Sequence, residues 1–165
     1  MEKKLRCYRS SLVTNGIGII TFGLWSIIKF IMSMVMQPIN FEDAANDEMA
    51  DPAAKIIALI IVGAVVVIII AIILAVHLYI GLSAYKEGIN GKKGSFYLVV
   101  AVVMALAICL TMTLYFVPHD NTEGVTMSNI AAFFIDLTTV VILADTIYAA
   151  LMSRKLAKKL ESEAE

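Results

Sequence analysis

Charged residues are scarce in this chain. Of its 165 residues, 16% are charged and 60% are hydrophobic, and the mean hydropathy is +0.86. A soluble domain averages roughly 25% charged and about 45–50% apolar residues, so this composition excludes an ordinary water-soluble fold, and it excludes disorder as well. The formal net charge is −1, which leaves no basic field to hold a nucleic acid.

Cysteine and histidine are equally rare. Cys7 precedes the first long apolar segment and Cys109 lies inside the third, so the two thiols form no disulfide framework. The chain has no C-x-x-C pair, which argues against a thiol oxidoreductase, and we expect Cys7 to be a free cytoplasmic thiol. His77 falls in the inner half of the membrane and His119 at its outer boundary, so the two cannot build one haem or zinc site. The sequence predicts no cofactor and no metal site.

Sequence motifs of known catalytic sites are also missing. The chain contains no H-E-x-x-H, no G-x-S-x-G and no Walker motif. The run Asn15-Gly16-Ile17-Gly18 has no preceding strand, so its glycines are expected to form a helix contact rather than a phosphate cradle. Because no nucleophile stands beside an acid or a base, we predict no catalytic residue and favour a protein that is not an enzyme.

Long apolar segments are what the sequence does have. A membrane span needs roughly 20 apolar residues, and four segments exceed this length, at about 10–36, 56–85, 95–118 and 126–153. The chain is therefore predicted to be an all-α membrane protein. We expect four transmembrane helices in an up-down antiparallel bundle, forming one membrane domain over residues 1–165.

Lysine and arginine set the expected orientation. Eleven of them fall in the N-terminal tail, in the short connection between the second and third segments, and in the charged tail 154–165, whereas the other two connections hold only Lys55. By the positive-inside rule both termini are predicted to be cytoplasmic, in a bacterial-type plasma membrane. The connection 37–55 then becomes an acidic outer loop.

Helix-capping residues predict where the helices begin and end. Asp51-Pro52 is an N-cap followed by proline at the first helical position, so the second helix is expected to begin there. Asn90-Gly91 predicts a helix end, and Gly94-Ser95 predicts a turn and a new cap. The second and third helices should therefore form a tight antiparallel hairpin.

Four ionisable residues fall inside the apolar segments: Lys29, His77, Asp136 and Asp145. A Lys or Asp at a helix centre costs about 2.5–3.5 kcal/mol, so each is expected to be paired, hydrated or neutral. Counting depth along the helices predicts an ion pair between Lys29 and Asp136. His77 and Asp145 share a depth on helices that are diagonal in a simple bundle.

Helical phase separates the two aspartates. Asp136 and Asp145 are nine residues apart, on opposite sides of the fourth helix, so Asp145 is expected to face the third helix or another subunit. On the first helix, Asn15, Ser26, Lys29 and Ser33 form a polar stripe. Hydrogen bonds to a neighbouring helix are favoured over a water path for this stripe.

Two functions follow from these residues. The first is a non-catalytic accessory, scaffold or oligomer-forming subunit that recognises a partner through buried charges, with the lipid bilayer and either a homo-oligomer or another membrane protein as partners. The alternative is a small proton- or ion-linked transporter or channel, with Lys29, His77, Asp136 and Asp145 lining the path. A membrane enzyme acting on lipid or quinone is a weaker third hypothesis.

Overall fold

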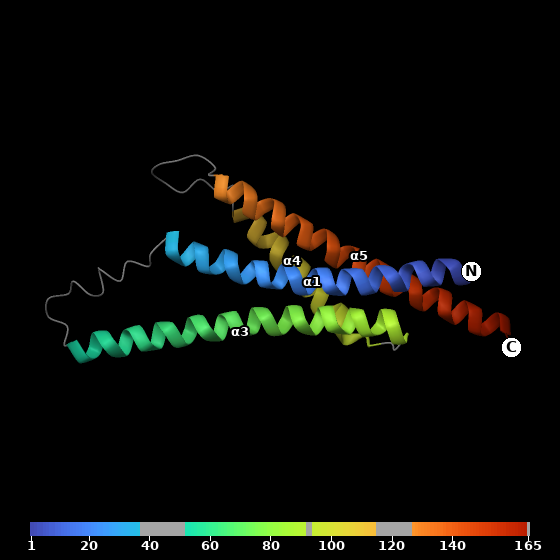
Figure 1. Cartoon of the computed structure of the whole chain (residues 1–165), viewed down its shortest axis with the longest axis horizontal. Coiled ribbons are helices and arrows are strands. Elements are labelled where there is room, and N and C mark those ends of the chain that lie inside the picture. The colour runs from blue at the N-terminus through green and yellow to red at the C-terminus, as the bar shows by residue number, and fades with distance from the viewer. Residues whose placement is uncertain (37–51, 92–93, 115–126, 165) are drawn as a thin grey trace. The chain divides into compact units, whose positions relative to one another are not determined.

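The chain is helical throughout the part that the structure describes. The computed structural model describes residues 1–36, 52–91, 94–114 and 127–164. They form four helices (Figure 1): α1 (Glu2–Met36), α3 (Pro52–Asn90), α4 (Phe96–Leu114) and α5 (Met127–Ala164). No strand occurs within these ranges, which confirms the predicted all-α class. Residues 37–51, most of the predicted acidic loop, lie outside the described part.

Each of the four helices is long and apolar enough to cross a membrane. The qualifying stretches are Glu2–Met32, Ile56–Asn90, Phe96–Thr113 and Ile130–Glu163. They coincide with the four apolar segments of the sequence, although the helices extend further. In particular, α5 continues to Ala164, so the predicted tail is a continuation of the last helix.

The expected capping residues mark the observed helix ends. α3 begins at Pro52 and ends at Asn90, and Gly91 follows in the left-handed region with φ 66°. The Gly91 N–H donates to the carbonyl of Glu87 at 2.9 Å, which closes the last turn and is a conformation that glycine adopts at little cost. α4 begins directly after Ser95, whose carbonyl accepts the N–H of Leu98.

The described chain divides into two compact units. The first unit contains residues 1–22 and 76–165, and the second contains residues 23–75. The first unit holds the buried apolar core, to which α1, α3, α4 and α5 all contribute. Its fully buried large side chains include Leu12, Ile19, Ile80, Tyr97 and Leu143. In the second unit, large apolar side chains such as Trp25, Ile28 and Ile60 are exposed.

Glycines bring α1 and α3 into backbone contact inside the first unit. A Cβ atom on Gly16 would lie 2.6 Å from the carbonyl oxygen of Gly81, and one on Gly88 would lie 2.7 Å from the carbonyl oxygen of Arg9. No side chain fits at either position. Because Gly16 pairs with Gly81 and Arg9 with Gly88, the two helices run in opposite directions here, and Gly16 forms a helix contact as predicted.

α5 packs against both α1 and α4 in the same unit. The rings of Tyr8 and Tyr148 meet edge to face at 6.0 Å, and a Cβ on Gly18 would make ordinary van der Waals contact with Ile142 at 3.6 Å. These pairs also describe antiparallel helices. α4 lies along α5 and contributes Tyr97, Leu98 and Ala101 to the shared core.

Candidate functional site

Asp145 of α5 forms a polar site with the first helix. Its Oδ2 atom accepts hydrogen bonds from Ser11 Oγ at 2.9 Å and from Asn15 Nδ2 at 2.7 Å. The two donors lie one turn apart on α1, 3.4 Å from each other. Asp145 was expected to face the third helix or another subunit. The α1–α5 contact instead brings Ser11 and Asn15 of the first helix to this carboxylate, and a contact with another subunit stays a prediction.

Within the described residues, the two donors to Asp145 carry no charge that would balance the carboxylate. Both are neutral groups, and interhelical hydrogen bonds inside a membrane contribute about 0.6 kcal/mol each on average. Their sum is smaller than the cost of about 2.5–3.5 kcal/mol for a charged Asp at a helix centre. Asp145 also remains exposed at the side of the helix pair, beside the exposed Val141 and Tyr148.

Asp136 and His77 are buried in the first unit, with 4% and 6% of their surfaces exposed. Asp136 begins a polar face of α5 that continues through Thr139, Thr146 and Ser153, all of them buried. The two threonine hydroxyls donate to carbonyls one turn earlier, at 2.9 and 2.7 Å. This polar face was not predicted from the sequence, which indicated a polar stripe on the first helix instead.

Of the polar stripe predicted on the first helix, Ser26, Lys29 and Ser33 fall in the second unit. Ser26 and Lys29 lie on its part of α1, and the side chain of Ser33 lies outside the described side chains. Asn15 belongs to the first unit, where it contacts α5. The predicted stripe is thus divided between the two units, and the ion pair between Lys29 and Asp136 stays a prediction.

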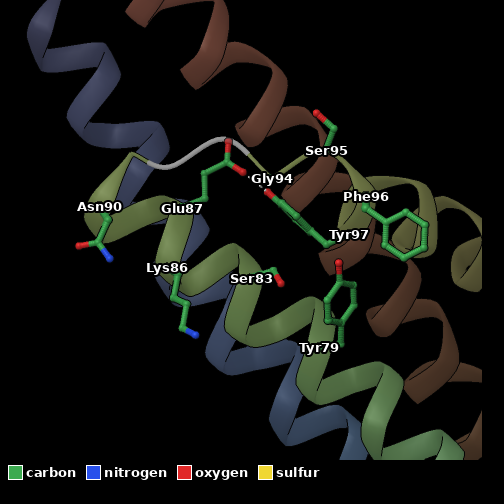
Figure 2. A pocket seen from close by; sticks show the side chains of 9 residues that line it. All are labelled: Tyr79, Ser83, Lys86, Glu87, Asn90, Gly94, Ser95, Phe96 and Tyr97. Atoms are coloured by element: carbon green, nitrogen blue, oxygen red, sulfur yellow. Dashed lines mark hydrogen bonds between the residues drawn. The ribbon is translucent and has the colours of Figure 1, made fainter.

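A second polar cluster joins α3, α4 and α5. Arg154 donates from Nε to Glu87 Oε1 and from Nη2 to Glu87 Oε2, both at 2.7 Å. The Tyr97 hydroxyl donates to the same Oε2 at 2.7 Å (Figure 2). Arg154 also donates to the carbonyl of Gly94 at 2.6 Å and to Ser95 Oγ at 3.2 Å. We call Glu87, Tyr97 and Arg154 the Glu87 cluster.

The Glu87 cluster is buried and was not predicted. The side chains of Glu87 and Arg154 are 3% and 19% exposed, and Tyr97 is 2% exposed. One signal was present in the sequence, because Glu87 is the only acid in a connection that otherwise carries Lys86, Lys92 and Lys93. An isolated acid among cations at the end of an apolar helix indicates a partner on a neighbouring helix.

A cavity of about 480 Å³ opens beside this cluster, between the end of α3 and the start of α4. Figure 2 shows Tyr79 and Ser83 on the side of α3 toward α4, and in this view Lys86 and Asn90 lie on the other side of the α3 ribbon. Nine residues line the cavity: Tyr79, Ser83, Lys86, Glu87, Asn90, Gly94, Ser95, Phe96 and Tyr97. It combines an aromatic wall with several hydrogen-bonding groups.

Among the described residues, no group of three or more His, Cys, Asp or Glu side chains is placed to hold a metal ion. Cys7 and Cys109 are exposed free thiols. Comparison with protein-family models, curated proteins and solved structures finds no match to this chain.

Proposed function

We propose that this protein is a non-catalytic subunit of a membrane complex that binds a partner helix through the α1–α5 face around Asp145. The observation that carries the proposal is an exposed carboxylate on a helix long and apolar enough to span a membrane, to which two neutral groups of the described chain donate hydrogen bonds. A basic side chain on a partner helix supplies the missing charge. The exposed Val141 and Tyr148, one turn to either side of Asp145, supply apolar contact for the same helix.

In a second copy of this chain, Lys29 lies too far from the site to pair with Asp145. In a parallel dimer the two copies lie at the same depth, so the partner residue must match the level of Ser11 and Asn15. Lys29 lies 14 residues beyond Asn15 on α1, which is about 21 Å at a rise of about 1.5 Å per residue. That distance is too long for a lysine side chain. Lys86 lies near the level of Ser11, because the Gly16–Gly81 and Arg9–Gly88 contacts align α3 with α1, so a second copy also offers a lysine at this depth. The proposal commits to a different membrane protein with a lysine or arginine in its span, and the purification described below distinguishes the two.

The proposal includes the orientation with both termini in the cytoplasm of a plasma membrane. The distribution of lysine and arginine supports it. Cys7 provides the test, because its thiol is exposed near the N-terminus. In a Cys109→Ser background, a membrane-impermeant maleimide should label Cys7 in inside-out vesicles and leave it unlabelled in intact cells. Labelling in intact cells would contradict this orientation.

The partner is tested by purification in native-lipid particles. The unmodified protein should co-purify with one membrane protein, and Asp145→Asn should lose it. Glu161→Gln, an exposed acid further along α5, is the matched control and should retain the partner. A monomer unaffected by Asp145→Asn would contradict the proposal. A homodimer dissociated by this substitution would assign the site to a second copy instead.

A second candidate function is proton or ion transport, with Lys29, His77, Asp136 and Asp145 along the path. The specific observation in its favour is the buried position of both His77 and Asp136 in the first unit. Counting from the Gly16–Gly81 and Asn15–Asp145 contacts, the two side chains lie at levels within about one helical turn. Reconstituted liposomes should then show pH-dependent flux that Asp136→Asn abolishes. Absence of flux would favour the subunit.

A further inference from the structure

The cavity between α3 and α4 has the chemistry of an anion site at a membrane interface. Among the described residues that line it, Lys86 is a cation outside the Glu87 cluster, and its side chain is exposed. Ser83 and Asn90 lie one turn to either side of Lys86 on α3. They add a hydroxyl and an amide donor to the lining.

The acid in the cavity is already neutralised. Both oxygens of Glu87 accept hydrogen bonds from Arg154, and one of them also accepts the Tyr97 hydroxyl. The Glu87–Arg154 pair therefore contributes no net charge, and the described lining residues together carry a charge of about +1, from Lys86. Among these residues, an anionic ligand meets no carboxylate that lacks a counterion.

The start of α4 adds further donors. Ser95 Oγ accepts a hydrogen bond from Arg154 Nη1, so its hydroxyl hydrogen remains for a ligand. Phe96 and Tyr97 are the first residues of α4 and line the cavity. The first N–H groups of a helix have no partner within it, and its N-terminus attracts negative charge. The lysine and the hydroxyls point to the same ligand independently of this helix end.

The remaining wall is aromatic and exposed. Tyr79 and Phe96 meet edge to face with ring centroids 6.1 Å apart, and 43% and 69% of their surfaces are exposed. Aromatic side chains of this kind are enriched at the boundary between hydrocarbon and headgroups. The cavity volume of about 480 Å³ falls in the usual range for small-molecule sites, about 300–1,000 Å³.

We infer that the α3–α4 cavity binds the phosphate group of an anionic ligand, held by Lys86, Ser95 and the start of α4. An anionic phospholipid headgroup and free phosphate share this chemistry. The inference does not depend on the partner helix at Asp145, because the two sites share no residue.

Binding is tested with the purified full chain in a neutral detergent. Three probes are added separately: dihexanoyl phosphatidylglycerol, dihexanoyl phosphatidylcholine and inorganic phosphate. Thermal unfolding is followed by circular dichroism. Phosphatidylglycerol should raise Tm in proportion to its concentration, whereas phosphatidylcholine should not. A shift with inorganic phosphate as well would assign the site to the phosphate group alone, and a shift with phosphatidylglycerol only would assign it to a lipid headgroup.

Substitutions separate this site from general charge attraction. Lys86→Ala removes a charge-assisted hydrogen bond and should weaken binding about tenfold or more, and Ser95→Ala should weaken it less. Lys158→Ala removes an equally exposed cation on α5 that does not line the cavity, and it should leave binding unchanged. Equal losses in Lys86→Ala and Lys158→Ala, or no Tm shift with either anion, would overturn the inference.

Discussion

Arg154 and Glu87 form a two-pronged ion pair between helices that are distant in sequence. Both hydrogen bonds measure 2.7 Å, and the carboxylate side chain is 3% exposed. Paired hydrogen bonds between a guanidinium and a carboxylate fix orientation as well as distance. Because Arg154 also bonds to Gly94 and Ser95 at the α3–α4 connection, one side chain of α5 fixes the end of that hairpin.

Glu87→Gln should therefore destabilise the protein strongly. It leaves the largely buried guanidinium of Arg154 without its counterion, and breaking a buried ion pair costs about 3–5 kcal/mol. Since Arg154 keeps 19% of its side chain exposed, we expect about 3 kcal/mol. The measurement is the free energy of unfolding in mixed micelles, titrated with a denaturing detergent and followed by circular dichroism.

The matched control for Glu87→Gln is Glu163→Gln. Glu163 pairs with Lys159 at 3.9 Å, and the two side chains are 51% and 61% exposed. Exposed pairs of this kind contribute little to stability, so the control should unfold at the same detergent fraction as the unmodified protein. Similar losses of unfolding free energy in both variants would mean that the buried Glu87–Arg154 pair stabilises the protein no more than an exposed pair does.

Tyr97→Phe tests the third member of the Glu87 cluster. The substitution keeps the buried ring and removes only the hydroxyl that donates to Glu87 Oε2. A hydrogen bond to a charged group contributes about 1.5–3 kcal/mol, and we expect a loss near the lower value because Arg154 still donates to the same oxygen. Tyr79→Phe, in an exposed ring of the same cavity, should leave the unfolding free energy unchanged. A larger loss in Tyr79→Phe would contradict this ordering.

Local chemistry in the sequence predicted the helices and several of their ends. Pro52 begins a helix because its ring suits the first helical position, and Gly91 ends one because it tolerates a positive φ. Both effects depend on a few consecutive residues. Arg154 was placed in a separate tail for a different reason. Its charge marks a membrane boundary, but nothing local stops the helix there, and α5 continues to Ala164.

The contacts between helices were largely out of reach of the sequence. The pairing of Glu87 with Arg154 depends on how α3 and α5 are rotated and aligned. α3 is apolar on every side over most of its length, so its periodicity does not indicate which face meets a neighbour. For the same reason, the periodicity of α3 did not indicate which of its residues contacts Gly16. The glycine was recognised as a helix contact, but Gly81 on the opposite helix was not.

The glycine contact between α1 and α3 predicts a position-specific effect of added methyl groups. Gly16→Ala places a Cβ 2.6 Å from the carbonyl oxygen of Gly81 and 2.9 Å from the backbone nitrogen of Tyr85. Because both are backbone atoms, the overlap is relieved only if the two helices move apart. We expect a loss of roughly 1–3 kcal/mol in unfolding free energy. Gly63→Ala is the control, because its added Cβ meets nothing within 4 Å. That variant should gain up to about 1 kcal/mol from helix propensity. A Gly16→Ala variant as stable as Gly63→Ala would contradict the close approach.

Asn15 and Asp145 should be energetically coupled. A double-mutant cycle with Asn15→Ala and Asp145→Ala isolates the 2.7 Å hydrogen bond from the other effects of each substitution. Cycles inside membranes average about 0.6 kcal/mol and reach about 1.7 kcal/mol. We expect the upper part of that range because the acceptor is a carboxylate. The control cycle replaces Thr14, an exposed neighbour on α1, and should give no coupling. If Asn15 and Asp145 gave additive losses, the carboxylate would not be held against α1, and the face proposed for the partner helix would lose its fixed charge.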